Sequence, residues 1–329
     1  MKIYDIVWEH KTITDKDVIK IIKHPAIQRL KNIWISTYGY LFELKRNATR
    51  YDHSIGVYLL LKHFKCSKQE QIAGLIHDVS HTALSHVSTY AFQHKYTGTE
   101  FHELQQYKFI QSSGLAALLI KLWYNPTQLL HDKKFSLLEN ELPDICADRI
   151  DYALRDGLHL QILSRQQVNQ VLKGLIVYNG EFVFSDVESA FIYSFNFYLL
   201  NLMFYGAATE AHFNNDFGNL VKYSVKNNIL HEKDWFTDDV KLTNKLKQSK
   251  DKKIKKWLTK YNNNLVVFED REHPDVVFPK KIRIVDPKVL IDNKPTRLSE
   301  LSQVYQKIIN DYKEHHIKHE LPIRVVYKS

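Results

Sequence analysis

The chain has 329 residues, of which 44% are hydrophobic and 25% are charged, as is ordinary for a globular enzyme with a sizeable core. Its two cysteines cannot form a disulfide framework, and its start lacks the basic and apolar regions of a signal peptide, so we expect a cytoplasmic protein. The net charge of +9 favours anionic partners. The most apolar run, residues 191–206, is interrupted by Asn196 and Asn201, which is typical of a buried helix and not of a membrane span.

Helical periodicity dominates the first two thirds of the chain, and the fold class that we predict is mainly α. Residues 18–33 show apolar positions at helical spacing around a His-Pro pair, which predicts two short helices. Asp52 is the expected N-cap of a helix over 53–64, and Ser67 precedes a second helix over 68–79. Further helical patterns cover residues 101–124, 143–156, 163–173 and 187–205.

Strand signals appear later in the chain. Residues 174–186 carry two β-rich runs around Asn179-Gly180, a type I′ turn signal that predicts a small β-hairpin. After residue 263, short β-rich runs (NNLVVF, KKIRIV and PIRVVY) surround one helix predicted over 298–312. We therefore predict three parts: a helical core over 1–165, a helical extension with the hairpin over 166–262, and a small α+β C-terminal subdomain over 263–329.

The basic segment 241–257 holds eight lysines and a single aspartate. It could bind nucleic acid, or it could be a solvated basic face. Aromatic residues are not interleaved with the lysines, as a surface that stacks bases would require. Both interpretations stay open.

Two imidazoles and two carboxylates form the sharpest pattern. The pair His77-Asp78 lies in an apolar run, where ionisable groups need a hydrogen bond, an opposite charge or a metal. His53 begins another apolar helix, and Asp148 begins an acidic one. Each residue alone would more often be structural, but this order along the chain favours a shared cation. Mixed nitrogen and oxygen ligands suit Mn, Fe, Co, Ni or Zn better than Ca, although Mg also fits the prediction of one divalent metal ion per chain.

Three segments resemble the signature segments of the HD-domain phosphohydrolases: RYDHSIGV, QIAGLIHDVSHTALSHV and DICADRIDYALRD. The resemblance is strongest to the deoxynucleoside triphosphate triphosphohydrolase branch, it covers about residues 20–160, and PAIQRLKNI extends it. It implies an HD helical core, a nucleotide substrate, and hydrolysis of a dNTP to a deoxynucleoside and triphosphate. It also implies a homo-oligomer, commonly a dimer or tetramer.

The resemblance also implies roles for single residues. Metal ligands would be His53, His77, Asp78 and Asp148. The scissile phosphate would be surrounded by His81, His86 and His102. The substrate would be contacted by Arg50, Arg149, Tyr152 and Asp156. On a continuous helix His77 and His81 would face the same side, and an imidazole can pass a proton to a leaving oxygen. The two arginines could instead pair with neighbouring acids: Asp52 for Arg50, and Asp144 or Asp148 for Arg149.

The sequence departs from the branch at several positions. Thr89 stands where the family has an acid, and Ile35 or Ser36 stands near the position of the family's sugar-contacting glutamine. The nucleotide-activation element reads DIVWE at residues 5–9, in which only Asp5 remains. Sugar recognition and nucleotide activation are therefore weakly supported.

Three other interpretations remain. The segment from His77 to His81 resembles the H-E-x-x-H helix of zinc proteases, but with Asp in place of Glu. A diiron HD oxygenase or a dinuclear HD phosphodiesterase would need more histidine ligands, which His81 and His102 could supply. A nucleic-acid-binding module could retain the HD core without turnover, using the basic segment 241–257.

Overall fold

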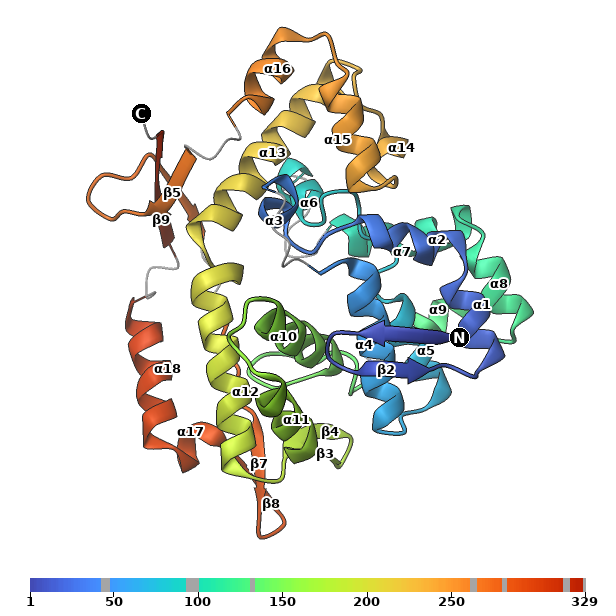
Figure 1. Cartoon of the computed structure of the whole chain (residues 1–329), viewed down its shortest axis with the longest axis vertical. Helices are drawn as coiled ribbons and strands as arrows, with labels where there is room; N and C mark the ends of the chain where they lie inside the picture. Colours follow the sequence, from blue (N-terminus) through green and yellow to red (C-terminus); the bar gives the residue numbers. More distant parts are fainter. Residues whose placement is uncertain are drawn as a thin grey trace.

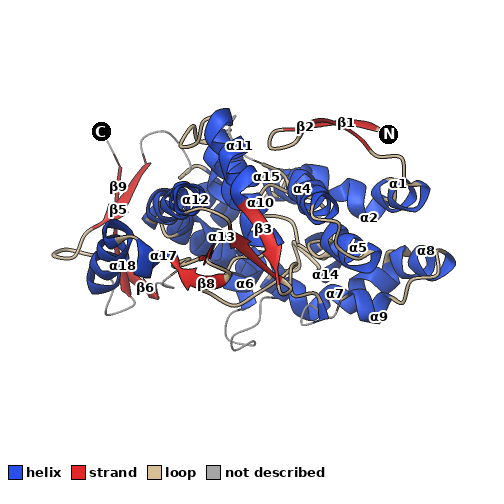
Figure 2. Cartoon of the chain, turned by 90° about the horizontal axis from the view of Figure 1, so that it is seen from below, coloured by secondary structure: helices blue, strands red, loops and turns tan. Residues whose placement is uncertain are grey.

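The computed structural model describes residues 1–42, 48–92, 101–130, 134–260, 265–279, 283–315 and 320–327. Helices form most of the body, and the strands form three small sheets (Figures 1 and 2). The prediction of a mainly α fold is therefore confirmed. None of the described helices is long and apolar enough to cross a membrane.

The helices of the first half are α1 (Lys16–Ile22), α2 (Pro25–Gln28), the 3-10 turn η1 (Arg29–Asn32), α3 (Thr37–Leu41), α4 (Arg50–His63), α5 (Lys68–Ile76), α6 (Val87–Phe92), α7 (Phe101–Ser112), α8 (Leu115–Lys121), α9 (Pro126–Leu129) and α10 (Ala147–His159). Those of the second half are α11 (Arg165–Gly174), α12 (Val187–Leu200), the π-helical turn η4 (Asn201–Tyr205), α13 (Ala208–Lys226), α14 (Glu232–Trp235), α15 (Asp239–Lys247), α16 (Lys252–Leu258), α17 (Leu298–Leu301) and α18 (Gln303–His315).

Helix α4 is the central helix of the core. It is buried almost all round from Ile55 to Leu61, so it is apolar on every face and not only along one stripe. It packs against α5 and α10, and α10 in turn packs against α12 (Figure 1). This packing brings the N-terminal turns of α4 and α10 to the C-terminal end of α5. A second apolar cluster joins α6 and α13 with α14, α15 and α16.

The strands form sheets of two, four and three members. A ribbon of β1 (Lys2–Asp5) and β2 (Glu9–Thr12) lies at one side of the body, and the sheet β5 (Leu265–Glu269), β9 (Glu320–Tyr327) and β6 (Val276–Pro279) lies at the other (Figure 2). The four-stranded sheet has the order β3 (Leu175–Tyr178), β4 (Glu181–Phe184), β7 (Lys288–Ile291) and β8 (Lys294–Arg297). All neighbours are antiparallel except β4 and β7, which run parallel.

The hairpin prediction is confirmed. Strands β3 and β4 pair from Leu175–Phe184 to Tyr178–Glu181. Between them, Asn179 has φ 51° and Gly180 has φ 78°, the left-handed conformations that a type I′ turn requires.

Two helix boundaries differ from the prediction in ways that matter for the site. Helix α4 begins at Arg50, because Thr49 and Asp52 form a reciprocal capping box, so Asp52 is not the N-cap. Helix α5 ends at Ile76. The expectation that His77 and His81 share a helix face is therefore wrong. The following residues form tight turns, and Arg29 binds the carbonyls of Val79 and His81 at 2.8 Å.

Other helix and strand boundaries also differ from the prediction. The single helix predicted over 101–124 is two helices, α7 and α8, separated at Gly114 with φ 79°. The helix predicted over 187–205 ends at Leu200 and continues as η4. In the run KKIRIV, residues 280–282 lie outside the described part and residues 283–285 are not a strand, whereas β6, β7 and β8 were not predicted.

The C-terminal region is shared between two sheets. Strand β7 pairs with β4, so one sheet joins the predicted extension to the predicted subdomain. Val285, Val289 and Tyr305 also belong to the same apolar core as α4 and α5. The division at residue 263 thus does not coincide with a break in the core.

Candidate metal centre and adjoining cavity

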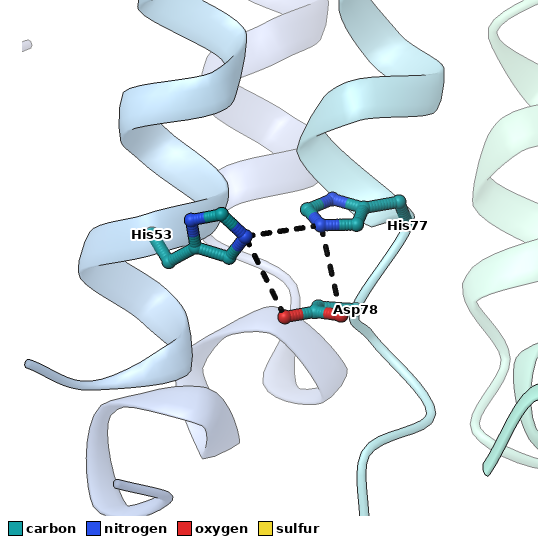
Figure 3. A group of neighbouring side chains, drawn as sticks. All are labelled: His53, His77 and Asp78. Atoms are coloured by element: carbon teal, nitrogen blue, oxygen red, sulfur yellow. Dashed lines mark hydrogen bonds and ion pairs between the residues drawn. The ribbon is translucent and has the colours of Figure 1, made fainter. Parts of the chain in front are cut away.

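The four predicted metal ligands lie together where α4, α5 and α10 meet. His53 is in the first turns of α4, His77 caps the C-terminus of α5, Asp78 follows it, and Asp148 is in the first turn of α10. His53 Nε2 lies 2.8 Å from Asp148 Oδ1 and 3.2 Å from His77 Nε2. Figure 3 shows the two rings and Asp78 pointing toward one position.

The hydrogen bonds at Nδ1 of His53 and His77 indicate which kind of group could lie between their Nε2 atoms. His77 Nδ1 lies 2.7 Å from the carbonyl oxygen of Gly74, and His53 Nδ1 lies 2.8 Å from Asp151 Oδ2, so both Nδ1 atoms donate. Both Nε2 atoms then face each other and Asp148. Burial lowers the pKa of His53, but its hydrogen bonds to Asp148 and Asp151 outweigh burial and raise that pKa to about 10, so positive charge is favoured at this position. A divalent ion would take the place of the Nε2 proton.

The spacing of the donor atoms fits a divalent ion. His77 Nε2 lies 3.4 Å from Asp148 Oδ1 and 3.6 Å from Asp78 Oδ1, and His53 Nε2 lies 3.9 Å from Asp78 Oδ2. Ligand atoms bound to one ion at about 2.1 Å are about 3–3.5 Å apart at the usual angles. The residues present therefore fit a metal of the predicted kind.

A buried ion cluster supports His53 from behind. Asp151 accepts from His53 and also binds Arg155 through both carboxylate oxygens at 3.0 Å. Arg155 reaches Asp5 at 2.8 Å, and all three charged side chains are almost fully buried. Sequence analysis did not assign Asp151 or Arg155 a role, although both lie in the quoted segment DICADRIDYALRD. No local signal pairs Arg155 with Asp5, 150 residues away.

Arg50 links the metal ligands to the predicted catalytic histidines. Its guanidinium binds Asp78 Oδ2 at 2.8 Å, lies 3.0 Å from His86 Nε2 and donates to Ser85 Oγ at 3.2 Å. It makes its ion pair with Asp78 and not with Asp52, whose carboxylate caps α4. Arg50 is thus buried and held at the edge of the candidate metal centre.

The three predicted catalytic histidines form one group beside Asp78. The rings of His81 and His102 stack with centroids 3.6 Å apart, and His86 lies 5.5 Å from His81. His81 Nε2 is 3.2 Å from Asp78 Oδ1. Burial, with Arg50 and His102 nearby, holds the pKa of His81 well below its ordinary value, so this imidazole is neutral.

The remaining predicted substrate residues lie on α10 and divide into two groups. The Arg149 guanidinium donates to the backbone carbonyls of Asn140 and Asp144 and pairs with Glu139 at 3.4 Å, so it is engaged by the preceding loop. The ring of Tyr152 lies 6.3 Å from that of His53. Asp156 accepts from Tyr205 at 2.8 Å, and burial raises its pKa to about 6.

A cavity of about 270 Å³ adjoins the histidine group at His86. It lies between α13, η4, the segment at residues 35–36 and the strands β6 and β9. The family departures Ile35, Ser36 and Thr89 all line it. Other polar side chains that line the cavity include Asn201, Glu210, Asn214 and Arg283. Sequence analysis gave them no role, because no motif marks the segments that carry them.

The chain is similar to one known protein over nearly its whole length and to another over about half of it. No family model matches the chain. The uncharacterized protein YdhJ of Bacillus subtilis is 32% identical over 309 residues, 94% of each chain. The metal-dependent phosphohydrolase cns2 of Cordyceps militaris is 28% identical over 173 residues, which are 53% of this chain and 50% of that protein.

Solved structures share the fold. A phosphohydrolase from Bacteroides thetaiotaomicron superposes with a TM-score of 0.68 and 16% identity, covering 92% of this chain and 94% of that one. A hypothetical protein from Aquifex aeolicus superposes with a TM-score of 0.66, also at 16% identity, covering 93% of both. The chain belongs to the same family as YdhJ of Bacillus subtilis.

Proposed function

We propose that this chain is a metal-dependent phosphohydrolase acting on a nucleotide, and that its leading reaction is conversion of a dNTP to a deoxynucleoside and triphosphate. The observation that carries the proposal is the convergence of three ligand atoms, His53 Nε2, His77 Nε2 and Asp148 Oδ1, which lie between 2.8 and 3.4 Å from one another. The ligands that we propose for one divalent ion are His53, His77, Asp78 and Asp148.

In this reaction, water oxygen attacks the α-phosphorus, the bond from phosphorus to the 5′ oxygen breaks, and a proton passes to that oxygen. A bound divalent ion would supply activation of the water and charge compensation for the phosphoryl oxygens. Arg50 is buried between Asp78 and His86, and its remaining N–H groups can bind a phosphoryl oxygen.

Proton transfer to the leaving oxygen would come from His86 or His102, whereas His81, which is neutral, would contact the scissile phosphate. Thr89 lies where the family has an acid, and it cannot take that role. Glu103 is exposed on α7 next to His102 in sequence, so it is the acid whose replacement tests compensation. The 270 Å³ cavity beside His86 could enclose the non-phosphate part of a substrate, which supports a nucleotide.

A second candidate is favoured by one observation. Asp78, His81 and His102 also place ligand atoms within 4.8 Å of one another, and Asp78 is shared with the His53–His77 group. A second ion there would make a dinuclear phosphodiesterase or a diiron oxygenase. Elemental analysis separates the two: about one ion per chain supports the triphosphohydrolase, and about two support the dinuclear enzymes.

The decisive experiment is a panel of dNTPs, NTPs, nucleoside monophosphates and short oligonucleotides with Mn, Co, Ni, Mg, Zn and Fe, with products identified by chromatography. We expect tripolyphosphate from at least one dNTP. His53→Ala should lower the rate at least about 10³-fold, because the ligand set is broken. His63→Ala, which removes an exposed imidazole at the other end of α4, is the matched control and should change little.

The outcomes discriminate among the candidates. Monophosphate release from oligonucleotides would replace the leading reaction by phosphodiester hydrolysis. Turnover of no phosphorylated substrate in any metal would overturn the hydrolase proposal.

A further inference from the structure

The turn that leads into His86 has a backbone conformation that few residues adopt. Leu84 and Ser85 have φ of 61° and 46°, so two successive residues other than glycine are left-handed. In this conformation Cβ crowds a neighbouring carbonyl oxygen, which costs free energy at each residue. Such a turn persists only where the surrounding structure holds it. The contacts that hold Leu84 and Ser85 therefore decide where His86 lies.

A carboxylate from a distant helix holds this turn. Asp239 lies in the first turn of α15, 155 residues after Leu84, and its side chain is fully buried. Its Oδ1 accepts from the Leu84 backbone N–H at 2.6 Å, and its Oδ2 accepts from the Trp34 backbone N–H at 3.0 Å. The Trp34 carbonyl in turn accepts from Ser85 Oγ at 2.5 Å. One carboxylate thus binds Leu84 directly and holds Ser85 through Trp34.

Arg29 balances the charge of Asp239 and holds the other end of the same segment. Burial lowers the pKa of Arg29 to about 10, and the charges of Asp239 and Asp238 oppose this effect, so the guanidinium lies near both carboxyls. The guanidinium also binds the carbonyl oxygens of Val79 and His81 at 2.8 Å. The segment is therefore fixed through carbonyl oxygens at its start and through an N–H at its end.

Arg50 connects the turn to the candidate metal centre. Its Nε donates to Ser85 Oγ at 3.2 Å, and its guanidinium lies 3.0 Å from His86 Nε2. The same guanidinium binds Asp78, a proposed metal ligand, at 2.8 Å. Displacement of the turn would therefore remove one contact of Arg50 and move His86 relative to it.

We propose that Asp239 is a positioning residue of the candidate centre, acting through the turn at Leu84 and Ser85. By holding this turn it sets the place of His86 and the direction of the Arg50 guanidinium. The inference rests on the proposed function for the roles of these two side chains: Arg50 binds a phosphoryl oxygen, and His86 belongs to the pair from which the leaving oxygen takes its proton.

The test variant is Asp239→Asn, which keeps the size of the side chain but turns an NH₂ group toward one of the two backbone N–H donors. That donor loses its acceptor, so the turn should relax. In crystal structures of the wild type and the variant we expect Leu84 or Ser85 to leave positive φ. We also expect His86 Nε2 to move beyond hydrogen-bonding distance of Arg50. His53 and Asp148 lie on other helices and should stay in place.

A kinetic comparison separates positioning from a general loss of stability. With the metal and substrate that give turnover, Asp239→Asn should lower kcat about 10–100-fold, since a well-placed proton donor contributes about 10²–10⁴-fold. The affinity for Mn²⁺ should fall by much less than the about 10–100-fold expected when the partner of a metal ligand is removed.

Asp238→Asn is the matched control. Asp238 is the N-cap of α15, where it accepts from the Lys241 N–H at 2.9 Å and pairs with the Lys241 ammonium at 2.8 Å. This variant removes the neighbouring buried charge and weakens the same helix start. It should leave kcat and the position of His86 unchanged.

A second variant is available if Asp239→Asn does not fold. Thr37 Oγ1 donates to the Leu84 carbonyl at 3.1 Å, on the side of the turn away from the Asp239 contact. Thr37→Val removes this hydrogen bond and keeps the side-chain shape, so it should shift the turn and lower kcat in the same direction.

The structural and kinetic results can fail separately. If the wild type hydrolyses no phosphorylated substrate, the proposed function fails, and a displaced His86 in Asp239→Asn still supports the positioning role. An unchanged turn with His86 in place would overturn that role. An equal loss of kcat in Asp239→Asn and Asp238→Asn would also overturn it, because the stability of α15 would then explain both.

Discussion

At the scale of single residues, the orientation of His53 depends on a charge cluster that does not touch substrate. Asp151 fixes the Nδ1 proton of His53, and this directs Nε2 at Asp148 and His77. Arg155 offsets the charge of Asp151 and of Asp5, so the three ions can be buried together. The ring orientation therefore follows from an ion cluster that spans the N-terminal ribbon and α10.

We expect Asp151→Asn to weaken metal binding by about 10–100-fold, because the partner of a ligating imidazole loses its charge. The matched control is Asp5→Asn, which removes the other carboxylate of Arg155 without touching His53. Both variants should lose stability in denaturant, and only Asp151→Asn should release Mn²⁺ or Co²⁺ to a chromogenic chelator at lower concentration. Equal metal affinity in the two variants would contradict the orienting role.

Glu210 leads to a prediction about stability and pH. Burial raises the pKa of Glu210 to about 7, above the ordinary 4.5. The folded protein therefore holds this proton more tightly than the unfolded chain, and stability falls as pH rises from about 4.5 to 7. Glu210→Gln has no such proton. It should gain up to about 3 kcal/mol over wild type between pH 4.5 and 8.

The measurement is urea denaturation of both proteins with chelator at several pH values. Other buried acids are present in both proteins and cancel in the difference. Stability curves that run parallel from pH 4.5 to 8 would show that Glu210 does not titrate in this range.

At the scale of elements, the sequence predicted the helices that carry motifs better than their ends. Periodicity and apolar content located α4, α5 and α10, and the order of His53, His77, Asp78 and Asp148 was enough to predict that they meet. The end of α5 could not be predicted, because it depends on Arg29 binding carbonyls of residues 79 and 81. Such a contact is set by tertiary packing and leaves no local signal.

The close approach of α4 to α10 depends on Gly56. A Cβ at this position would lie 1.9 Å from Asp151 Oδ1 and 2.1 Å from Arg155 Nη2. Alanine favours helices over glycine by about 1 kcal/mol, but here overpacking should dominate and cost about 1–3 kcal/mol net. Gly56→Ala should also weaken metal binding, since it displaces the partner of His53.

Thermal melting and chelator competition measure both effects. Ser54→Ala is the control in the same helix, because it removes a buried hydroxyl without a partner among the described residues. A stabilised Gly56→Ala protein with unchanged metal affinity would mean that α10 can move away freely.

At the scale of the whole molecule, the cavity is assembled from segments that are far apart in the sequence. Ser36 and His86 come from the first hundred residues, whereas Glu210 lies on α13 and Leu321 on β9. The sequence predicted that His53, His77, Asp78 and Asp148 lie together because these residues belong to short contiguous motifs. It could not predict the cavity, because unrelated helices and strands close around it. The part of the chain with recognisable motifs and the part that would choose the substrate are therefore different.

The basic segment 241–257 gives a prediction that separates turnover from nucleic-acid binding. In the structure this segment covers most of α15 and most of α16, which lie at the top of Figure 1, away from α4, α5 and α10. Lys245 pairs with Asp234 at 2.6 Å, whereas Lys252, Lys255 and Lys256 are exposed.

We expect His77→Ala to abolish hydrolysis of a mononucleotide, because it removes a proposed metal ligand. The triple variant with Lys252, Lys255 and Lys256 replaced by Gln should retain hydrolysis within about twofold, since screening weakens charges beyond about 10 Å.

Duplex DNA binding should respond in the opposite way. Each lysine that neutralises a phosphate adds about 0.9 to the slope of log affinity against log salt, so the triple variant should lower that slope by up to about 3. His77→Ala should leave it unchanged. Fluorescence anisotropy over a salt series measures the slope, and a coupled phosphate assay measures turnover. If the lysine variant loses mononucleotide hydrolysis as completely as His77→Ala, the basic segment acts on the catalytic centre, and the two activities are not independent.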